Sequence, residues 1–182
     1  MLEIVLFAVL SIPLVFLSWR ALFNLRRHGV YRFITWECIL WIGVNNINQP
    51  TESKAILGFS PATALLIAAL LIVLSSLSVM LQHGKISGKR KDETLFGFEK
   101  TTSLVEVGLF RYIRHPMYLS LLCLTWGLLL KNPEPGLLLV ALVGTITCIY
   151  TALIEEQENI AYFGEEYRQY MHRTKMFIPF IL

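Results

Sequence analysis

The sequence predicts an all-α integral membrane protein, a bundle of about five transmembrane helices with a cytosolic helical cap at its C-terminal end. The chain has 182 residues, of which 55% are apolar and only 16% charged, and its mean hydropathy of +0.58 is unusual for a soluble domain. Several windows approach the roughly 20 apolar residues that cross about 30 Å of hydrocarbon as a helix. Alternating strands of the membrane-barrel type are absent, so helices are the expected spanning elements.

Two apolar runs open the chain. The first covers residues 2–23, with Pro13 as an expected kink. The second, residues 33–44, contains Trp36 and Trp41 and is short for a crossing, so a tilted or re-entrant helix is an alternative to a full span.

Three further runs follow. The third covers residues 61–81 and begins with Pro61, in the first-turn position that proline favours. The fourth starts near Met117, and the tight turn KNPEPG joins it to the fifth at residues 135–154. No repeat or second domain is visible, so residues 1–182 are expected to form a single membrane domain. It comprises N-terminal spans and a loop (1–103) and a core (104–182).

The basic residues predict how the bundle is oriented. Fourteen of the sixteen Lys and Arg fall in segments that five crossings place on one side, which the positive-inside rule assigns to the cytosol. Lys54 and Lys131 fall in the loops on the other side. The basic residues follow membrane boundaries and form no separate basic domain, so no nucleic-acid partner is expected. The cysteines lie in apolar runs without metal-ligand spacing, and no metal site is predicted.

The stretch LFRYIRHPMY places polar side chains against the fourth apolar run. Pro116 disfavours helix at the residue before it, so the chain should turn at His115 and the helix should begin just after. Such a turn leaves backbone N–H groups free to bind an anion such as a carboxylate. The alternative, which spacing alone favours, is that Arg111 and Arg114 are interfacial anchors that snorkel to the headgroups.

A second polar cluster follows the fifth run, beginning with Glu155 and Glu156. Acidic side chains are poor anchors beside anionic lipid, where the surface potential favours Lys and Arg by about 1 kcal/mol each. A positively charged group should therefore face them, either a ligand or Arg111 or Arg114, and a pairing with arginine does not exclude a functional role.

Helical spacing divides this cluster into two faces. Glu156, Ile160, Phe163 and Tyr167 are expected to turn inward, with Glu155 and its neighbours on the adjoining face, and Gly164 is expected to end the helix. A basic turn and an acidic, aromatic helix at one membrane face suit a zwitterionic cofactor. One part would bind its carboxylate and the other its ammonium or hydroxyls, with aromatic faces for a sulfonium or a base.

These two segments, LVEVGLFRYIRHPMY and EEQENIAYFGEEYRQYMHRTKMFIP, resemble the isoprenylcysteine carboxyl methyltransferase and phospholipid methyltransferase superfamily of integral membrane enzymes. The resemblance covers residues 104–179. It implies S-adenosylmethionine as the methyl donor, bound at the cytosolic side. The matching positions that it implies for the cofactor are Gly108, Arg114, His115, Pro116, Tyr118, Glu155, Glu156 and Tyr167.

The chain departs from the family pattern at three positions. Ser120 stands where the family commonly has glycine, Phe110 where it often has tyrosine, and Asn159 where it often has leucine. Ser120 places a side chain where a close approach is expected, which changes the shape expected for the pocket.

The expected activity is methyl transfer to a lipid-like acceptor, of the isoprenylcysteine carboxylate or phospholipid headgroup type, that arrives from the bilayer. A small volatile or soluble acceptor is the alternative. Positioning and exclusion of water supply most of the catalysis of such a transfer. A carboxylate acceptor needs no base, whereas an ammonium acceptor must first lose a proton, and His115 and Glu156 are the candidate catalytic groups. Glu37, a charged residue within the second apolar run, would either extend toward Arg32 or line the entrance for the acceptor.

Two alternatives belong to other classes of protein. A membrane reductase of the sterol type, with NADPH as cofactor, would have a related C-terminal half. A non-catalytic scaffold or transporter is the other alternative, although transporters usually show repeats or charges at mid-bilayer.

Overall fold

A computed structural model gives the structure of the protein and describes residues 1–23, 27–47, 60–85 and 100–179. These residues form α-helices and one short 3-10 helix, with no β-strand among them, which confirms the all-α class. The elements in chain order are α1 (Leu2–Leu22), α2 (His28–Asn45), α3 (Pro61–His83), η3 (Gly108–Arg111), α4 (Pro116–Lys131), α5 (Pro135–Phe163) and α6 (Glu165–Arg173).

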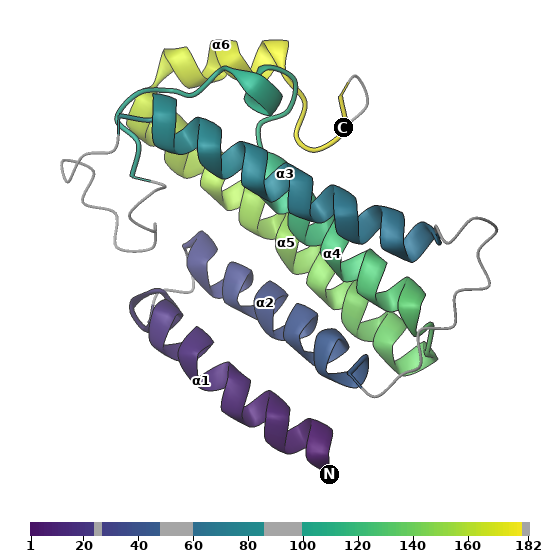
Figure 1. Cartoon of the computed structure of the whole chain (residues 1–182). Coiled ribbons are helices and arrows are strands. Elements are labelled where there is room, and N and C mark those ends of the chain that lie inside the picture. Colours follow the sequence, from purple (N-terminus) through teal and green to yellow (C-terminus); the bar gives the residue numbers. More distant parts are fainter. Residues whose placement is uncertain (24–26, 48–59, 86–99, 180–182) are drawn as a thin grey trace.

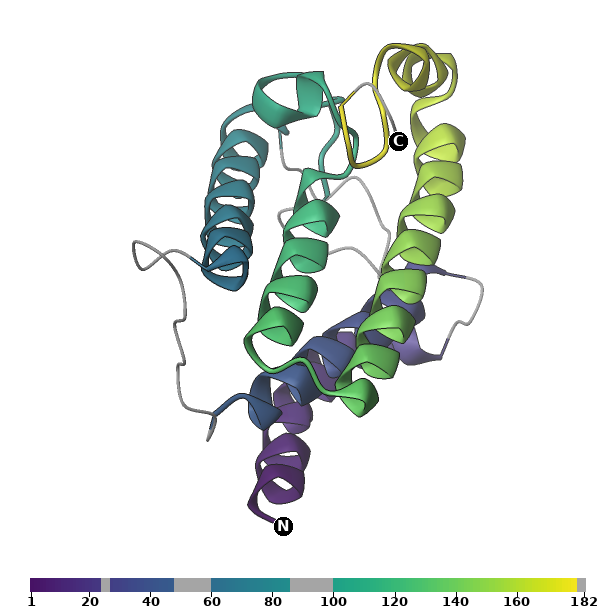
Figure 2. The same cartoon turned by 90° about the vertical axis from the view of Figure 1, so that its right-hand side faces the viewer.

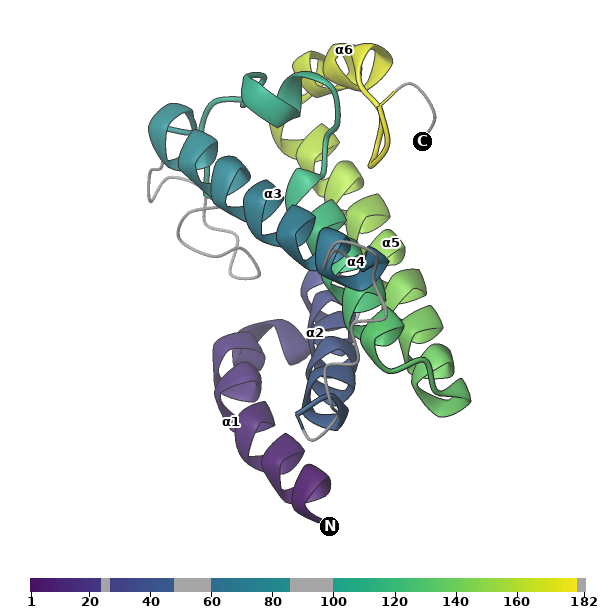
Figure 3. The same cartoon turned by 45° about the vertical axis from the view of Figure 1, so that its right-hand side comes forward.

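The long helices run up and down through one bundle, with the two chain termini at opposite ends (Figure 1). Helices α3, α4 and α5 lie side by side, α2 packs mainly against α5, and α1 packs against α2 on the outside (Figure 3). Helix α6 and η3 lie over one end of this bundle, with the C-terminal segment between them (Figure 2). We call this end, where α4 begins and α5 finishes, the α6 end.

Within the part of the chain that the structure describes, three helices are long and apolar enough to cross a membrane, namely α1, α3 and α5. Their outward side chains include Phe16, Leu74 and Ile146, which are exposed and suited to contact lipid. Helix α4 is apolar but shorter, and α2 contains charged residues. The membrane bundle is confirmed, and the expected total of five crossings stays a prediction.

The observed helix bounds differ from the expected ones at two polar positions. Helix α2 begins at His28, ahead of residue 33, because His28 and Arg32 are buried within the protein. Helix α5 continues past residue 154 to Phe163, and its polar last turns contact other elements through Glu156 with Arg114 and Glu158 with His28. Gly164, with φ +65°, ends α5 as predicted.

Two apolar clusters hold the bundle together. One joins α2, α4 and α5 far from the α6 end, around Ile42, Leu129 and Ala141. The other includes Tyr118 of α4, Cys148 and Ala152 of α5, and Phe177 of the C-terminal segment. Phe177 is 2% exposed, so this cluster fixes the C-terminal segment against the end of the bundle. The division of the domain at residue 103 stays a prediction.

Candidate functional site

The site begins with the turn that leads into α4. Gly108 adopts φ +62° at the start of η3, next to Val79 of α3, whose Cγ2 would lie 3.0 Å from an added Cβ. A side chain at this position would require an unfavourable backbone conformation and would crowd Val79. His115 precedes α4 in a non-helical conformation, and Pro116 occupies the first turn. The turn expected at His115 is therefore confirmed.

The C-terminal segment pairs with this turn along its backbone. The N–H of Arg114 donates to the carbonyl of Lys175 at 2.8 Å, and the N–H of His115 donates to that of Met176 at 3.1 Å. The expectation that the turn leaves its backbone N–H groups free for an anion is wrong for these two amides. Buried amides need acceptors, and the extended C-terminal segment supplies them.

The Arg114 guanidinium is held by protein groups. Its Nε donates to Glu156 Oε1 at 2.6 Å, and its Nη1 donates to the carbonyl oxygens of Thr174 at 2.6 Å and Met171 at 3.4 Å. The Nε2 of His115 lies 3.3 Å from the same Glu156 oxygen. The pairing between glutamate and arginine considered from the sequence is therefore present, as a buried Arg114–Glu156 ion pair.

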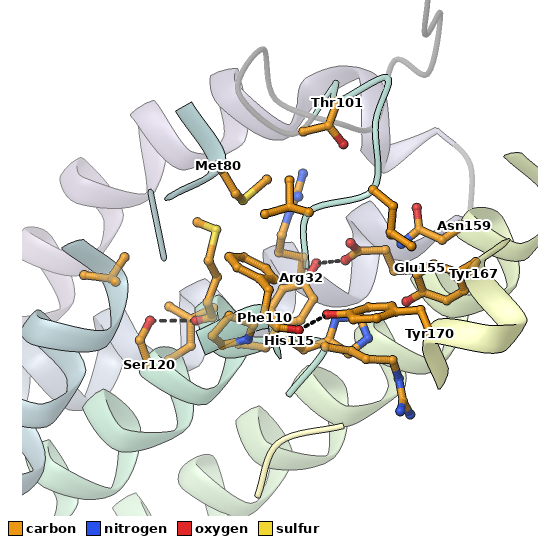
Figure 4. A pocket seen from close by; sticks show the side chains of 18 of the residues that line it. Arg32, Met80, Thr101, Phe110, His115, Ser120, Glu155, Asn159, Tyr167 and Tyr170 are labelled. Atoms are coloured by element: carbon orange, nitrogen blue, oxygen red, sulfur yellow. Dashed lines mark hydrogen bonds between the residues drawn. The ribbon is translucent and has the colours of Figure 1, made fainter. Parts of the chain in front are cut away.

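Glu155 has different surroundings from its neighbour. Its Oε2 accepts a hydrogen bond of 2.6 Å from the Tyr118 hydroxyl, and the charges of His115, His28 and Arg32 act on it. Its carboxylate faces a cavity rather than the wall behind it (Figure 4). Consecutive residues of a helix point about 100° apart, so the two glutamates of one motif face different parts of the molecule.

The cavity has a volume of about 290 Å³ and opens at the α6 end, between α2, α3, α4, α5 and α6. Its polar end contains Glu155, Asn159 and Tyr167, and the opposite side contains Met80 and Ser120 (Figure 4). The remaining lining is largely apolar and comes from several helices: Trp36, Val73, Leu104, Val105, Phe110, Met117, Leu121 and Phe163. A polar ligand part and an apolar one can therefore lie side by side.

Six of the eight predicted cofactor positions line this cavity: Arg114, His115, Pro116, Tyr118, Glu155 and Tyr167. Gly108 and Glu156 do not line it, although both shape the residues that do. Glu156 is buried, as predicted for the inward face. The α5 residues that line the cavity are Glu155 and Asn159 of the adjoining face, together with Phe163 of the inward face. Ser120 also lines the cavity, and its hydroxyl donates to the carbonyl of Met117 at 2.6 Å.

Two cavity residues of α2 were missed as site residues by sequence reasoning. Arg32 is 5% exposed and its Cζ lies 5.4 Å from the centre of the Trp36 ring. Their spacing of four residues, on one face of a helix, was the available signal. Glu37, which we expected near Arg32 or at the acceptor's way in, accepts a hydrogen bond of 2.6 Å from Ser11 of α1.

A second buried pair connects α2 to α5 beside the cavity. His28 Nδ1 lies 2.6 Å from Glu158 Oε2, and Arg27 approaches the other oxygen of Glu158 at 3.5 Å. Burial lowers the pKa of His28, but the hydrogen bond to Glu158 and the neighbouring carboxylates outweigh it, so the pKa is raised. This pair fixes the first turn of α2, and with it Arg32, against the end of α5.

Comparison with known proteins identifies similar chains. Methanethiol S-methyltransferase 1 of Bradyrhizobium diazoefficiens is 29% identical over 96% of this chain and 53% of its own length. Methanethiol S-methyltransferases of Crocosphaera subtropica and Pseudomonas deceptionensis are 30% and 36% identical over 60% and 39% of this chain, and over 43% and 26% of their own lengths. The chain thus spans about half the length of the first relative and less of the others. No solved structure matches the chain significantly.

The family model described as phospholipid methyltransferase matches residues 57–166, more than half of the chain. The match includes α3, the turn at His115, α4 and α5 with both glutamates, and so the superfamily resemblance of the sequence is confirmed. The chain belongs to the phospholipid methyltransferase family.

Proposed function

We propose that the protein is an integral membrane methyltransferase that uses S-adenosylmethionine and binds it at the α6 end, facing the cytosol. The observation that carries this proposal is a single cavity in which the Glu155 carboxylate and aromatic rings adjoin an apolar wall. The family assignment supports methyl transfer over the reductase and scaffold alternatives. The cytosolic orientation rests on the positive-inside rule.

The polar end of the cavity fits the chemical groups of this cofactor. Glu155 would pair with the ammonium, and its other contact, with Tyr118, holds the carboxylate in place. The rings of Phe163 and Tyr167 line the same end and offer faces for a base or a cation. Burial raises the pKa of Tyr167, so its phenol stays protonated and can donate a hydrogen bond. Bound S-adenosylmethionine supplies a methyl group activated by a positively charged sulfur.

The names of the relatives, which describe methyl transfer to the sulfur of methanethiol, favour a small apolar thiol as the acceptor. Val73, Met80 and Leu121 line the apolar part of the cavity and would bind such a molecule by excluding water. A thiol reacts as its thiolate, so it must lose a proton. His115 lines the cavity and its Nε2 contacts Glu156, an arrangement in which Glu156 orients the ring that accepts this proton.

A lipid-like acceptor is the second candidate. It is favoured by the apolar lining that α3 contributes, since the outer face of the same helix is exposed and apolar. An acceptor dissolved in the bilayer could reach the cavity beside this helix. Each buried CH₂ contributes about 0.8 kcal/mol, so a long tail would raise the apparent affinity steeply.

The test combines binding with transfer. The purified protein is titrated with S-adenosylmethionine by calorimetry, and transfer of a labelled methyl group is then measured in vesicles. The acceptors compared are methanethiol, a long-chain thiol, and a lipid with an amine headgroup. We expect saturable binding and methylation of at least one thiol. Absence of cofactor binding by the folded protein would contradict the proposed function, and methylation of the lipid alone would make the second candidate correct.

A further inference from the structure

Arg32 lies in the cavity but outside both sequence motifs and outside the residues that the family model matches. It belongs to α2, which reaches the cavity because His28 is fixed to Glu158 of α5 one turn earlier. The Arg32 side chain is buried and lies over the Trp36 ring. The first half of the chain therefore contributes a cation to a pocket whose other charged side chains, Arg114 and Glu155, come from the second half.

The two arginines of the cavity differ in their surroundings. Arg114 donates through Nε to Glu156 and through Nη1 to backbone carbonyls, so this guanidinium mainly holds the wall. Arg32 comes from α2, lines the same cavity, and lies within electrostatic reach of Glu155. A guanidinium stays charged even when it is buried, and its planar fork binds a carboxylate through two parallel hydrogen bonds.

Glu155 alone does not match a ligand that has both an ammonium and a carboxylate. A carboxylate that enters a partly apolar cavity loses its hydration, and this costs free energy unless a cation or several donors replace the water. The two backbone amides of the turn that would have been such donors are already bonded to Lys175 and Met176. The Arg32 guanidinium lines the same cavity and has the charge for this purpose.

We propose that Arg32 binds an anionic group in the cavity, with Trp36 supporting its guanidinium. The anion is either the carboxylate of the cofactor's methionine part or the ionised acceptor. This inference rests on the proposed function, since it assigns a residue of α2 to the same ligand site.

The experiment compares Arg32→Gln with a matched control, Arg111→Gln. Arg111 is an exposed arginine at the same end of the bundle, and its Cζ also lies near an aromatic ring, 6.0 Å from the centre of Tyr112, but it does not line the cavity. Calorimetry measures the dissociation constants of S-adenosylmethionine and of its decarboxylated analogue for the wild-type protein and both variants.

If Arg32 binds the cofactor carboxylate, Arg32→Gln should weaken S-adenosylmethionine binding roughly tenfold or more and leave binding of the decarboxylated analogue within about twofold. If Arg32 binds the acceptor, cofactor binding should stay unchanged in Arg32→Gln. The KM for the thiol should then rise about tenfold, and the pH dependence of kcat/KM should move to higher pH. Either result supports the proposal, and Arg111→Gln should match the wild-type protein in every measurement.

Unchanged cofactor affinity together with unchanged KM and pH dependence in folded Arg32→Gln would overturn the proposal. An equal loss of affinity for both cofactor forms, without a change in KM or pH dependence, would also overturn it, because the loss would not depend on an anion. If Arg32→Gln does not fold, Arg32→Lys, which retains the charge but lacks the fork, is measured in the same way against the same criteria. The titration of the wild-type protein distinguishes failure of this proposal from failure of the proposed function. The proposed function fails only if the wild-type protein does not bind S-adenosylmethionine.

Discussion

Two adjacent regions at the α6 end use the same kinds of residue for opposite purposes. The cavity region around Glu155 presents a carboxylate, an amide and aromatic rings to open space. The region behind it, which we call the clamp, consists of Arg114, Glu156 and residues 174–177, and its polar groups bond to one another. The two glutamates are neighbours along the chain. Two adjacent glutamates can therefore have different roles, one facing the ligand cavity and the other holding the end of the bundle together.

Removal of a clamp residue should give the largest effect on stability. Glu156→Ala would leave the Arg114 guanidinium buried without its carboxylate, and breaking a buried ion pair in this way typically costs about 3–5 kcal/mol. The free energy of unfolding in detergent measures the loss. Glu166→Ala, on the exposed side of α6, should change it by about 0.5 kcal/mol or less. Equal stability of the two variants would show that the clamp does not hold the end of the bundle.

Alkaline pH should destabilise the protein through the aromatic residues of the cavity. Burial and the nearby Glu155 and Glu156 raise the pKa of Tyr167, so above about pH 10 the unfolded chain loses this proton while the folded protein retains it. Stability should therefore fall as the pH rises past about 10, by up to about 1.4 kcal/mol per pH unit for this group. Tyr167→Phe should fall less steeply between pH 10 and 11, and an identical slope would contradict the assignment.

A smaller change is expected when the cavity glutamate loses its support. Tyr118→Phe removes the hydroxyl that donates to Glu155, which costs about 1 kcal/mol of positioning and should weaken S-adenosylmethionine binding about fivefold. The variant should remain folded, because the ring stays in its apolar cluster. Calorimetric affinity equal to that of the wild-type protein would mean that this contact is not part of the binding site.

The smallest effect is expected at the outer edge of the α6 end. Arg173 donates two hydrogen bonds to Glu106, at 2.9 and 3.0 Å, but the arginine side chain is 61% exposed. Exposed ion pairs contribute about 0–1 kcal/mol and are screened by salt. Arg173→Gln should therefore lower the melting temperature only slightly, and less at high salt. A loss as large as that of Glu156→Ala would place this pair in the clamp.

The sequence predicted the helices correctly where an apolar run is bounded by a proline or a glycine. Pro61, Pro116 and Gly164 each mark an observed helix boundary, because their backbone preferences act locally. The bounds of α2 were not predictable in the same way. Its first turn contains His28 and Arg32, whose burial depends on Glu158 and Trp36 and on the packing of α2 against α5.

The site was predicted as a set of residues but not as an arrangement. Motif spacing identified most of the positions that line the cavity, yet a helical repeat could not decide which of Glu155 and Glu156 faces it. That depends on Arg114, which lies 42 residues earlier in the chain than Glu156. Likewise, the carbonyls of Lys175 and Met176 that bond to the turn at His115 come from a segment whose sequence has no recognisable strand pattern.

The division between cavity and clamp is tested most directly by titrating S-adenosylmethionine into the wild-type protein, Glu155→Gln and Glu156→Gln in the same detergent. Affinities are taken per folded molecule, with the folded fraction measured by thermal unfolding. We predict that Glu155→Gln weakens binding roughly tenfold or more, as expected for loss of a charged hydrogen-bond partner, while Glu156→Gln lowers stability and weakens binding less. Unchanged affinity in Glu155→Gln, or a greater loss in folded Glu156→Gln, would contradict the account.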